Sequence, residues 1–406
     1  MSGYDQLPMT GIRIVDLTHD WAGPHATRLL GDFGAEVIKV EYSRRIDSMR
    51  GANKENEAYN HHPRWHEINR NKLSITLDLR IADDLERFRE LVRVSDIVVE
   101  SSRVGVMERF GLGYETLREI KPDIIVVSMS PFGQTGPEAA YAGYGGCLEP
   151  LSGIQVLTGY DESSKPMRIR EVDVTNGVLG ACAIMTALIY RQQTGCGQWV
   201  DLSQFEAATS GLIGEHLLEY VMNGTQTLPL GNRHRFHAPQ GCYRCEGDDK
   251  WVAIMIRSED EWKTFCESMD RSELASDARF ASRQDRMRSH DELDQIIEEW
   301  TLSRTHYEVM HQLQRAGIAA GAILNAAEIA IDPHLQERGF FQTLENGNHL
   351  AFPGMPFHFS ECKSQIRRPG PDLGEHNAEV LCGILGISRD EIKPLTEDKI
   401  GTAFDI

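Results

Sequence analysis

The sequence predicts an α/β protein with a doubly wound, mostly parallel sheet and a second, smaller α+β domain. Between residues 12 and 129, short apolar runs alternate with amphipathic segments of helical period, the pattern of a parallel sheet covered by helices. Past residue 222 this alternation stops, and a polar stretch leads into strands and charged helices. The chain has 406 residues, more than one hydrophobic core usually holds, which also favours two domains.

The first elements form a predicted βαβ unit. Ile12–Leu17 reads as a buried strand, Pro24–Asp32 as a helix begun by proline, and Glu36–Val40 as a second strand after Gly34. No GxGxxG motif follows the first strand, so NAD binding is poorly supported.

The same alternation continues further along the chain. It predicts helices at Asp83–Val94 and Tyr114–Ile120 and strands at Ile97–Glu100 and Ile124–Met129. We expect the large domain to span residues 1–222.

The remaining elements place the other two segments. Val178–Tyr190 is apolar on all sides and predicts a core helix. After the polar stretch GNRHRFHAPQG come two strands around the turn EGDD and charged amphipathic helices between residues 259 and 316. Residues 223–331 are therefore the predicted small domain, and residues 332–406 a segment that returns to the large one.

Composition narrows the class of protein. The formal charge of -19 would repel nucleic acid, no apolar run has the length of a membrane span, and the N-terminus lacks the pattern of a secretion signal. We expect a cytoplasmic protein with reduced cysteines. Cys242 and Cys245 form a CxxC, either half of a zinc site or two residues on one strand; lacking a second pair nearby, we expect no metal.

Six separated segments carry a resemblance to a known family: GIRIVDLTHDWAGPHATRLLGDFGAEVIKVE, NRNKLSITLDL, the stretch from VGVMERFGLG to SPFGQTGP, REVDVTNGVLGACAIMTALIYRQQTGCGQWVDLSQFEA, LGNRHRFHAPQGCY and PDLGEHNAEVL. In this order they resemble the family III CoA-transferases (CaiB/BaiF type). The resemblance implies a Rossmann-like large domain in a ring-like chain that forms an interlaced dimer, a homodimer or a heterodimer with a related subunit. It also implies acyl-CoA and a carboxylic acid as substrates, with no prosthetic group.

Asp173, in REVDVTNGV, stands where the family has its catalytic aspartate. A carboxylate suits this exchange because its attack on a thioester gives a mixed anhydride, which CoA thiolate can attack in turn. At the start of a helix, backbone N–H groups and the helix dipole are expected to keep it ionised. The alternative reading is a plain N-terminal helix cap.

The resemblance also assigns residues to coenzyme A. The matching positions are His19, Asp20, Trp21, Lys72, Ser101 and Arg109. Arg44, Arg45 and Arg70 either add positive charge there or are solvated surface residues. Lysine and arginine suit phosphates. Trp21 either stacks on adenine, lines the acyl pocket or packs in the core.

Two residues bear on the reaction class. Related racemases carry a histidine where this chain has Tyr144, which disfavours a 2-methylacyl-CoA racemase. Glu149 lies near the active site in relatives and either orients the acyl group or is structural. A third alternative is one subunit of a hetero-oligomeric CoA-transferase.

The substrate is suggested by arginines. Arg168 and Arg170 precede Asp173, and Arg233, His234 and Arg235 fall in a loop expected to face the site. Either they bind a second carboxylate on the substrate, or they are surface charges and contacts to the phosphates of CoA. We expect dicarboxylic acids, with succinyl-CoA as donor and an acceptor such as benzylsuccinate.

Overall fold

The computed structural model describes residues 7–53, 55–161, 163–344 and 351–392. They divide into two compact units. The first holds the described parts of Met1–Gln155, Arg168–Thr225 and Arg338–Ile406, and the second those of Val156–Met167 and Gln226–Glu337. The second unit thus includes residues 156–167, which the sequence analysis assigned to the large domain.

The first unit contains a parallel sheet of six strands in the order β3-β2-β1-β4-β5-β6. This is the strand order of a Rossmann-like doubly wound sheet. The strands are β1 (Arg13–Leu17), β2 (Glu36–Glu41), β3 (Lys72–Thr76), β4 (Ile97–Glu100), β5 (Ile125–Ser130) and β6 (Trp199–Ser203). The predicted α/β class and parallel sheet are confirmed.

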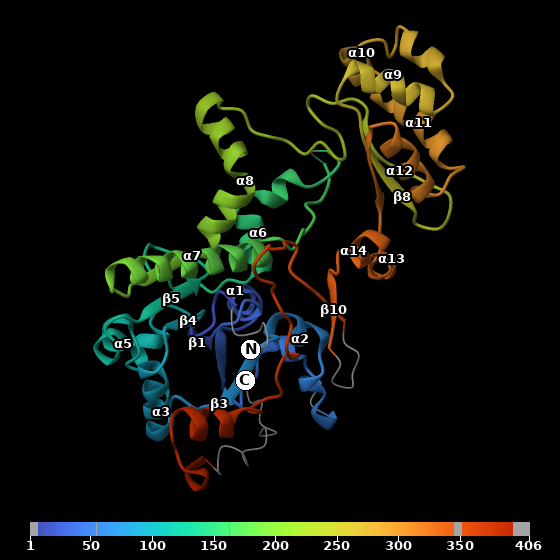
Figure 1. The fold of residues 1–406 in the computed structure, drawn as a ribbon. Helices are drawn as coiled ribbons and strands as arrows, with labels where there is room; N and C mark the ends of the chain where they lie inside the picture. The colour runs from blue at the N-terminus through green and yellow to red at the C-terminus, as the bar shows by residue number, and fades with distance from the viewer. Residues whose placement is uncertain (1–6, 54, 162, 345–350, 393–406) are drawn as a thin grey trace. The chain divides into compact units, whose positions relative to one another are not determined.

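Helices cover both faces of this sheet (Figure 1). The α-helices described in this unit are α1 (Ala22–Asp32), α2 (Pro63–Asn69), α3 (Ala82–Arg93), α4 (Val106–Arg109), α5 (Tyr114–Ile120), α6 (Gly145–Leu151), α7 (Val172–Thr194) and α8 (Gln204–Asn223). On one face α1 and α7 bury Ala26, Leu30 and Ile184 against the strands. Their approach is close, because a Cβ at Gly177 of α7 would lie 2.4 Å from Cδ2 of His25 on α1.

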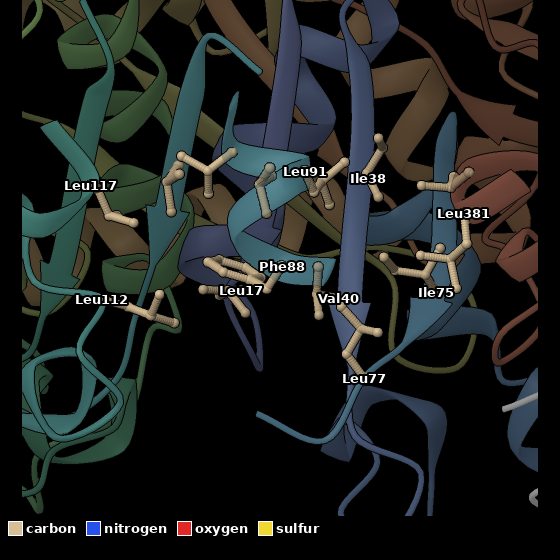
Figure 2. Packing of buried hydrophobic residues seen from close by; sticks show 14 of the residues in the cluster. Leu17, Ile38, Val40, Ile75, Leu77, Phe88, Leu91, Leu112, Leu117 and Leu381 are labelled. Carbon is tan, nitrogen blue, oxygen red and sulfur yellow. The ribbon is translucent and has the colours of Figure 1, made fainter. Parts of the chain in front are cut away.

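The opposite face of the sheet holds the larger core. Phe88 and Leu91 of α3 and Leu117 of α5 lie there in one cluster with Ile38 and other strand residues, as Figure 2 shows. Leu381, from the end of the described chain, lies in the same cluster. The returning segment is therefore part of this core.

The returning segment also covers the edge strand β3. It carries β10 (Phe341–Thr343), β11 (Ala351–Pro353) and a π-helix at Ala378–Ile384. The Ser74 backbone N–H donates to Nδ1 of His376 over 3.2 Å, and that of Thr76 donates to Oδ1 of Asn377 over 2.8 Å. Side chains thus occupy edge groups that would otherwise invite strand pairing.

The second unit is a three-stranded antiparallel sheet, β7-β8-β9, with helices around an aromatic core of Trp262, Phe265 and Phe280. Its elements are β7 (Gln240–Arg244), β8 (Trp251–Met255), α9 (Glu259–Ser268), α10 (Arg283–Arg288), α11 (His290–Thr301), α12 (His306–Arg315), β9 (Ala319–Ile323), α13 (Ala326–Ala330) and α14 (Pro333–Glu337). Cys242 lies in β7, and burial raises the pKa of Cys245, the residue after this strand, to about 11. A thiol of that pKa is a poor metal ligand at neutral pH.

Within the part of the chain that the structure describes, one helix, α7, is long and apolar enough to cross a membrane by length and composition. In the structure one of its faces packs on the core of the first unit through Gly180, Ala181, Ile184 and Ala187. It therefore serves as a core helix, as predicted, although Val178, Met185 and other apolar side chains of its opposite face are exposed.

Candidate active site

A cavity of about 1250 Å³ lies at the carboxyl ends of the strands in the first unit. Residues that directly follow β1, β2, β3, β4 and β5 line it, together with the start of α6 and α7. In the sheet, β2 and β4 flank β1 on opposite sides, so the chain order reverses beside β1. Ligands of doubly wound sheets bind in the crevice formed at such a reversal.

The cavity is rich in positive charge although the chain is acidic. Its lining includes Arg45, Arg64, Arg80, Arg103, Arg109, Arg168 and Arg170, against Asp20, Glu41, Asp78 and Asp173. Arginine forks bind phosphate and carboxylate oxygens in pairs. An anionic ligand is therefore favoured here despite a net charge of -19.

Five of the residues predicted to contact the coenzyme line this cavity: His19, Asp20, Trp21, Ser101 and Arg109. The loops after β1 and β4 are joined there, because the His19 backbone N–H donates to Oγ of Ser101 over 3.0 Å. Desolvation inside the cavity and the charge of Lys39 lower the pKa of His19. Both effects disfavour the charged form of this imidazole.

The prediction that Lys72 contacts the coenzyme is wrong. Its side chain is fully buried, and Nζ donates to Oδ2 of Asp16 (2.8 Å), to the carbonyl of Pro24 (3.0 Å) and to Oδ1 of Asn69 (2.9 Å). All three donors of the ammonium group are used. Lys72 begins β3 and holds the sheet to α1 from inside.

Two of the arginines predicted to add positive charge to the coenzyme site, Arg44 and Arg70, do not line the cavity either. Arg44 is exposed but does not line the cavity, whereas its neighbour Arg45 does. Arg70 is buried in an ion pair with Asp32 at 2.8 Å. The sequence analysis missed Arg64, Arg80 and Arg103; the signal for Arg80 and Arg103 was their place shortly after a strand.

Asp173 is the second residue of α7 and lines the cavity. It is not a helix cap, because Glu171 occupies that position. In the described part of the chain its carboxylate accepts no hydrogen bond and forms no ion pair. Its two oxygens lie only 2.5 and 2.7 Å from where a Cβ of Gly145 would stand, so the absence of a side chain at Gly145 makes room for the carboxylate.

The environment does not favour ionisation of Asp173 as predicted. Burial raises the pKa of this carboxyl, Arg168 opposes the rise, and Glu149 and Asp20 add to it. The desolvated anion is disfavoured because no hydrogen-bond donor compensates the charge. A carboxylate of raised pKa is a more basic and more reactive nucleophile.

Glu149 lies in α6, behind the cavity wall. Its side chain is 1% exposed, and Oε2 is 3.3 Å from Nε of Arg168 and accepts a hydrogen bond from Gln155 Nε2 at 3.2 Å. Tyr144, at the site of the racemase histidine, precedes α6 and lines the cavity. Glu149 thus reaches the site through Arg168.

The loop 229–241 belongs to the second unit. There Arg233 forms ion pairs with Asp291 and Asp294, and His234 stacks on His237 with ring centroids 4.4 Å apart. The charge of Arg233 is therefore already paired within this unit. For Arg235 and the orientation of this loop toward the site, the expectation stays a prediction.

Comparison with known proteins gives a consistent result. The sequence model of "CoA-transferase family III" matches residues 9–377. The chain is 33% identical over 98% of its length to the succinyl-CoA–L-malate CoA-transferase alpha subunit of Chloroflexus aurantiacus, covering 94% of that protein. It is 31% identical to the succinate–glutarate CoA-transferase of Agrobacterium fabrum, over 94% of this chain and 97% of that one.

A solved structure shares the fold. The crystal structure of a CaiB/BaiF family protein from Brucella suis superposes with a TM-score of 0.84 and 30% identity, over 93% of this chain and 99% of that one. An anion-binding cavity at the strand ends, an unpaired carboxylate in its wall and a full-length match agree with one another. The chain belongs to the CoA-transferase family III, and it is a CoA-transferase.

Proposed function

We propose that this enzyme moves coenzyme A from an acyl-CoA donor, such as succinyl-CoA, to a dicarboxylic acid, with Asp173 as the covalent nucleophile. The observation that carries the proposal is the state of this carboxylate. It lies in the wall of an arginine-rich cavity, its pKa is raised by burial, and the described residues give it no partner. A structural aspartate is normally hydrogen-bonded when buried.

The proposed reaction exchanges acyl groups without net redox change. The Asp173 carboxylate attacks the thioester carbonyl, and the tetrahedral intermediate expels CoA thiolate, which leaves a mixed anhydride between the acyl group and Asp173. The thiolate then attacks the aspartyl carbonyl, which releases the donor acid and forms an aspartyl-CoA thioester. The acceptor carboxylate attacks this thioester and forms a second anhydride. The returning thiolate attacks the acceptor's acyl carbon, giving the new acyl-CoA and free Asp173.

The coenzyme site in this proposal is the group of arginines that follow the strands. Arg45, Arg80, Arg103 and Arg109 line the cavity and would bind the phosphates of CoA, with His19, Asp20, Trp21 and Ser101 around the rest. Every step uses side chains of this chain and the two substrates. No prosthetic group is needed.

The relatives support dicarboxylic substrates, since their names include malate, glutarate and citramalate beside succinyl-CoA or succinate. Benzylsuccinate stays a candidate acceptor. Trp21 and Tyr144 line the cavity and offer aromatic surface for a benzyl group.

Trapping of the acyl-enzyme tests the role of Asp173. Incubation with succinyl-CoA followed by hydroxylamine is expected to modify Asp173, as read by peptide mass spectrometry, and Asp173→Ala should abolish exchange. Glu119→Gln, an exposed carboxylate on α5, is the matched control and should exchange normally. Normal exchange by Asp173→Ala contradicts the proposal, and solvent-deuterium uptake at the α-carbon without an adduct would indicate a racemase instead.

We also propose that a second copy, or a related subunit, covers the outer face of α7 and α8. Val178 and Met185 on α7 and Leu217 and Leu218 on α8 are exposed, and exposed apolar side chains that gather on one surface mark protein contacts. One relative is named an alpha subunit and another a beta subunit. An interlaced dimer, located in the cytoplasm, is the form proposed; light scattering on the purified chain alone separates a homodimer from a subunit that needs a partner.

A further inference from the structure

Arg168 lies beside the nucleophile without pairing with it. Its guanidinium packs over Gly146, with Nη1 3.3 Å and Cζ 3.4 Å from the position of a Cβ there. The Asp173 carboxylate packs over Gly145 in the same way. Because consecutive Cα atoms are about 3.8 Å apart, the two charged groups occupy adjacent places along the start of α6.

The positive charge of Arg168 acts on the Asp173 carboxylate electrostatically, without direct contact. It lowers the pKa of Asp173, although burial raises that pKa by more. No ion pair joins the two groups in the described chain. A direct pair would occupy the carboxylate oxygens that must attack the thioester, so the separation keeps the nucleophile free.

In the described chain, the guanidinium of Arg168 has a partner at Nε only. Nε lies 3.3 Å from Oε2 of the buried Glu149, which Gln155 also contacts. Among the described residues neither Nη atom has a hydrogen-bond acceptor, and 48% of the side chain is exposed at the cavity. Two parallel N–H donors are the arrangement that binds a carboxylate bidentately.

We propose that Arg168 binds the distal carboxylate of a short dicarboxylic substrate while its other end reacts at Asp173, and that Glu149 positions Arg168 for this. The inference rests on the proposed transfer through Asp173. A role in holding CoA phosphates is less suitable for Arg168. The phosphates of CoA are a pantetheine arm away from the thioester, and the thioester carbon must lie at Asp173, the immediate neighbour of Arg168.

The size of the expected effect follows from the hydrogen bonds between Arg168 and the distal carboxylate. Hydrogen bonds to a charged group are worth about 10- to 150-fold in affinity. A monocarboxylate of the same length cannot form them, so its binding does not depend on this arginine. At a pH where Asp173 is ionised in both enzymes, Arg168 should therefore decide between dicarboxylates and monocarboxylates.

The test compares Arg168→Met with wild type on two substrate pairs, one dicarboxylic and one monocarboxylic, at a pH well above the acid limb of both enzymes. With succinyl-CoA and glutarate, kcat/KM is expected to fall about 10- to 150-fold; with butyryl-CoA and acetate it should stay within about threefold. Arg118→Met, an exposed arginine on α5, is the control and should change neither. Equal losses on both pairs, or no loss with the dicarboxylates, overturn the assignment.

Glu149→Gln separates positioning from general damage. Its loss should be confined to dicarboxylates, and Arg168→Met combined with Glu149→Gln should be no worse than Arg168→Met alone, because both changes act on the same interaction with the substrate. Additive losses overturn the positioning role. Hydroxylamine trapping with butyryl-CoA in Arg168→Met reports on Asp173 independently: an adduct there upholds the proposed function whatever the dicarboxylate kinetics show.

Discussion

Gly145 makes the position of the nucleophile directly testable. In Gly145→Ala the new methyl group would lie 2.5 and 2.7 Å from the two carboxylate oxygens of Asp173 and 2.8 Å from Cγ. Favourable contacts of such atoms begin near 3.5 Å, so the carboxylate must retreat by about 1 Å. A displacement of this size at a reacting atom costs about 100-fold in rate, or about 2.7 kcal/mol in the activation barrier.

The folding stability of Gly145→Ala should stay the same or rise, although its reaction rate falls. The clash involves the end of one side chain, which can rotate, and Gly145 does not have a positive φ. Alanine is the better residue in a helix by up to about 1 kcal/mol. The variant should therefore unfold at the same temperature as wild type or a higher one while reacting more slowly.

The assay is a single-turnover measurement of CoA release from succinyl-CoA, with calorimetry on the same samples. Gly321→Ala in the second unit, where a Cβ meets no heavy atom within 4 Å, controls for the substitution itself and should leave the rate unchanged. Acylation of Gly145→Ala at the wild-type rate would show that the reactive carboxylate does not lie against Gly145.

Further predictions concern pH and stability. Asp173 must be ionised to attack, so activity falls as pH drops through its raised pKa. Arg168→Met removes a charge that lowers this pKa and should move the acid limb of the kcat/KM profile to higher pH. Glu149→Gln removes a charge that raises this pKa and should move the acid limb to lower pH. Shifts of the same sign in both variants contradict this reasoning. Lys72→Met removes the cation paired with the buried Asp16 carboxylate, so the unfolding free energy measured in urea should fall by about 3–5 kcal/mol; a loss below about 1 kcal/mol argues against a charged pair. Asn377→Ala removes both bonds to the edge of β3 and should cost about 1–3 kcal/mol, with no change in the pH profile.

The sequence predicted the sheet well where strands are apolar. The strands at residues 12–17, 36–40, 97–100 and 124–129 all appear within two residues of their predicted bounds. The two edge strands, β3 and β6, were not predicted as strands, because KLSIT and WVDLS carry polar residues inside. Lys72 and Ser74 are buried there only because Asp16 and Glu41 compensate them, a pairing that no local pattern reveals.

The site was predicted by motif rather than by geometry. Spacing and resemblance singled out Asp173 and the loop at His19–Trp21, which do meet in one cavity. Residue type alone could not separate Lys72 from Arg80; the difference lies in the strand bounds, because Lys72 begins β3 and Arg80 follows its carboxyl end. The raised pKa of Asp173 depends on burial and on the nearby charges of Glu149 and Asp20, which only the packed structure brings together.

The hydrogen bonds that cover the edge of β3 form late in the synthesis of the chain. Ser74 and Thr76 obtain their edge partners from His376 and Asn377, about three hundred residues later in synthesis. At a translation rate of roughly 5–20 residues per second, about fifteen seconds or more pass between the synthesis of β3 and that of its edge partners. The backbone groups at the edge of β3 lack these partners during that time. A chain truncated before His376 would lack these partners and leave the edge of β3 free to pair with another chain, so we expect such truncated products to aggregate.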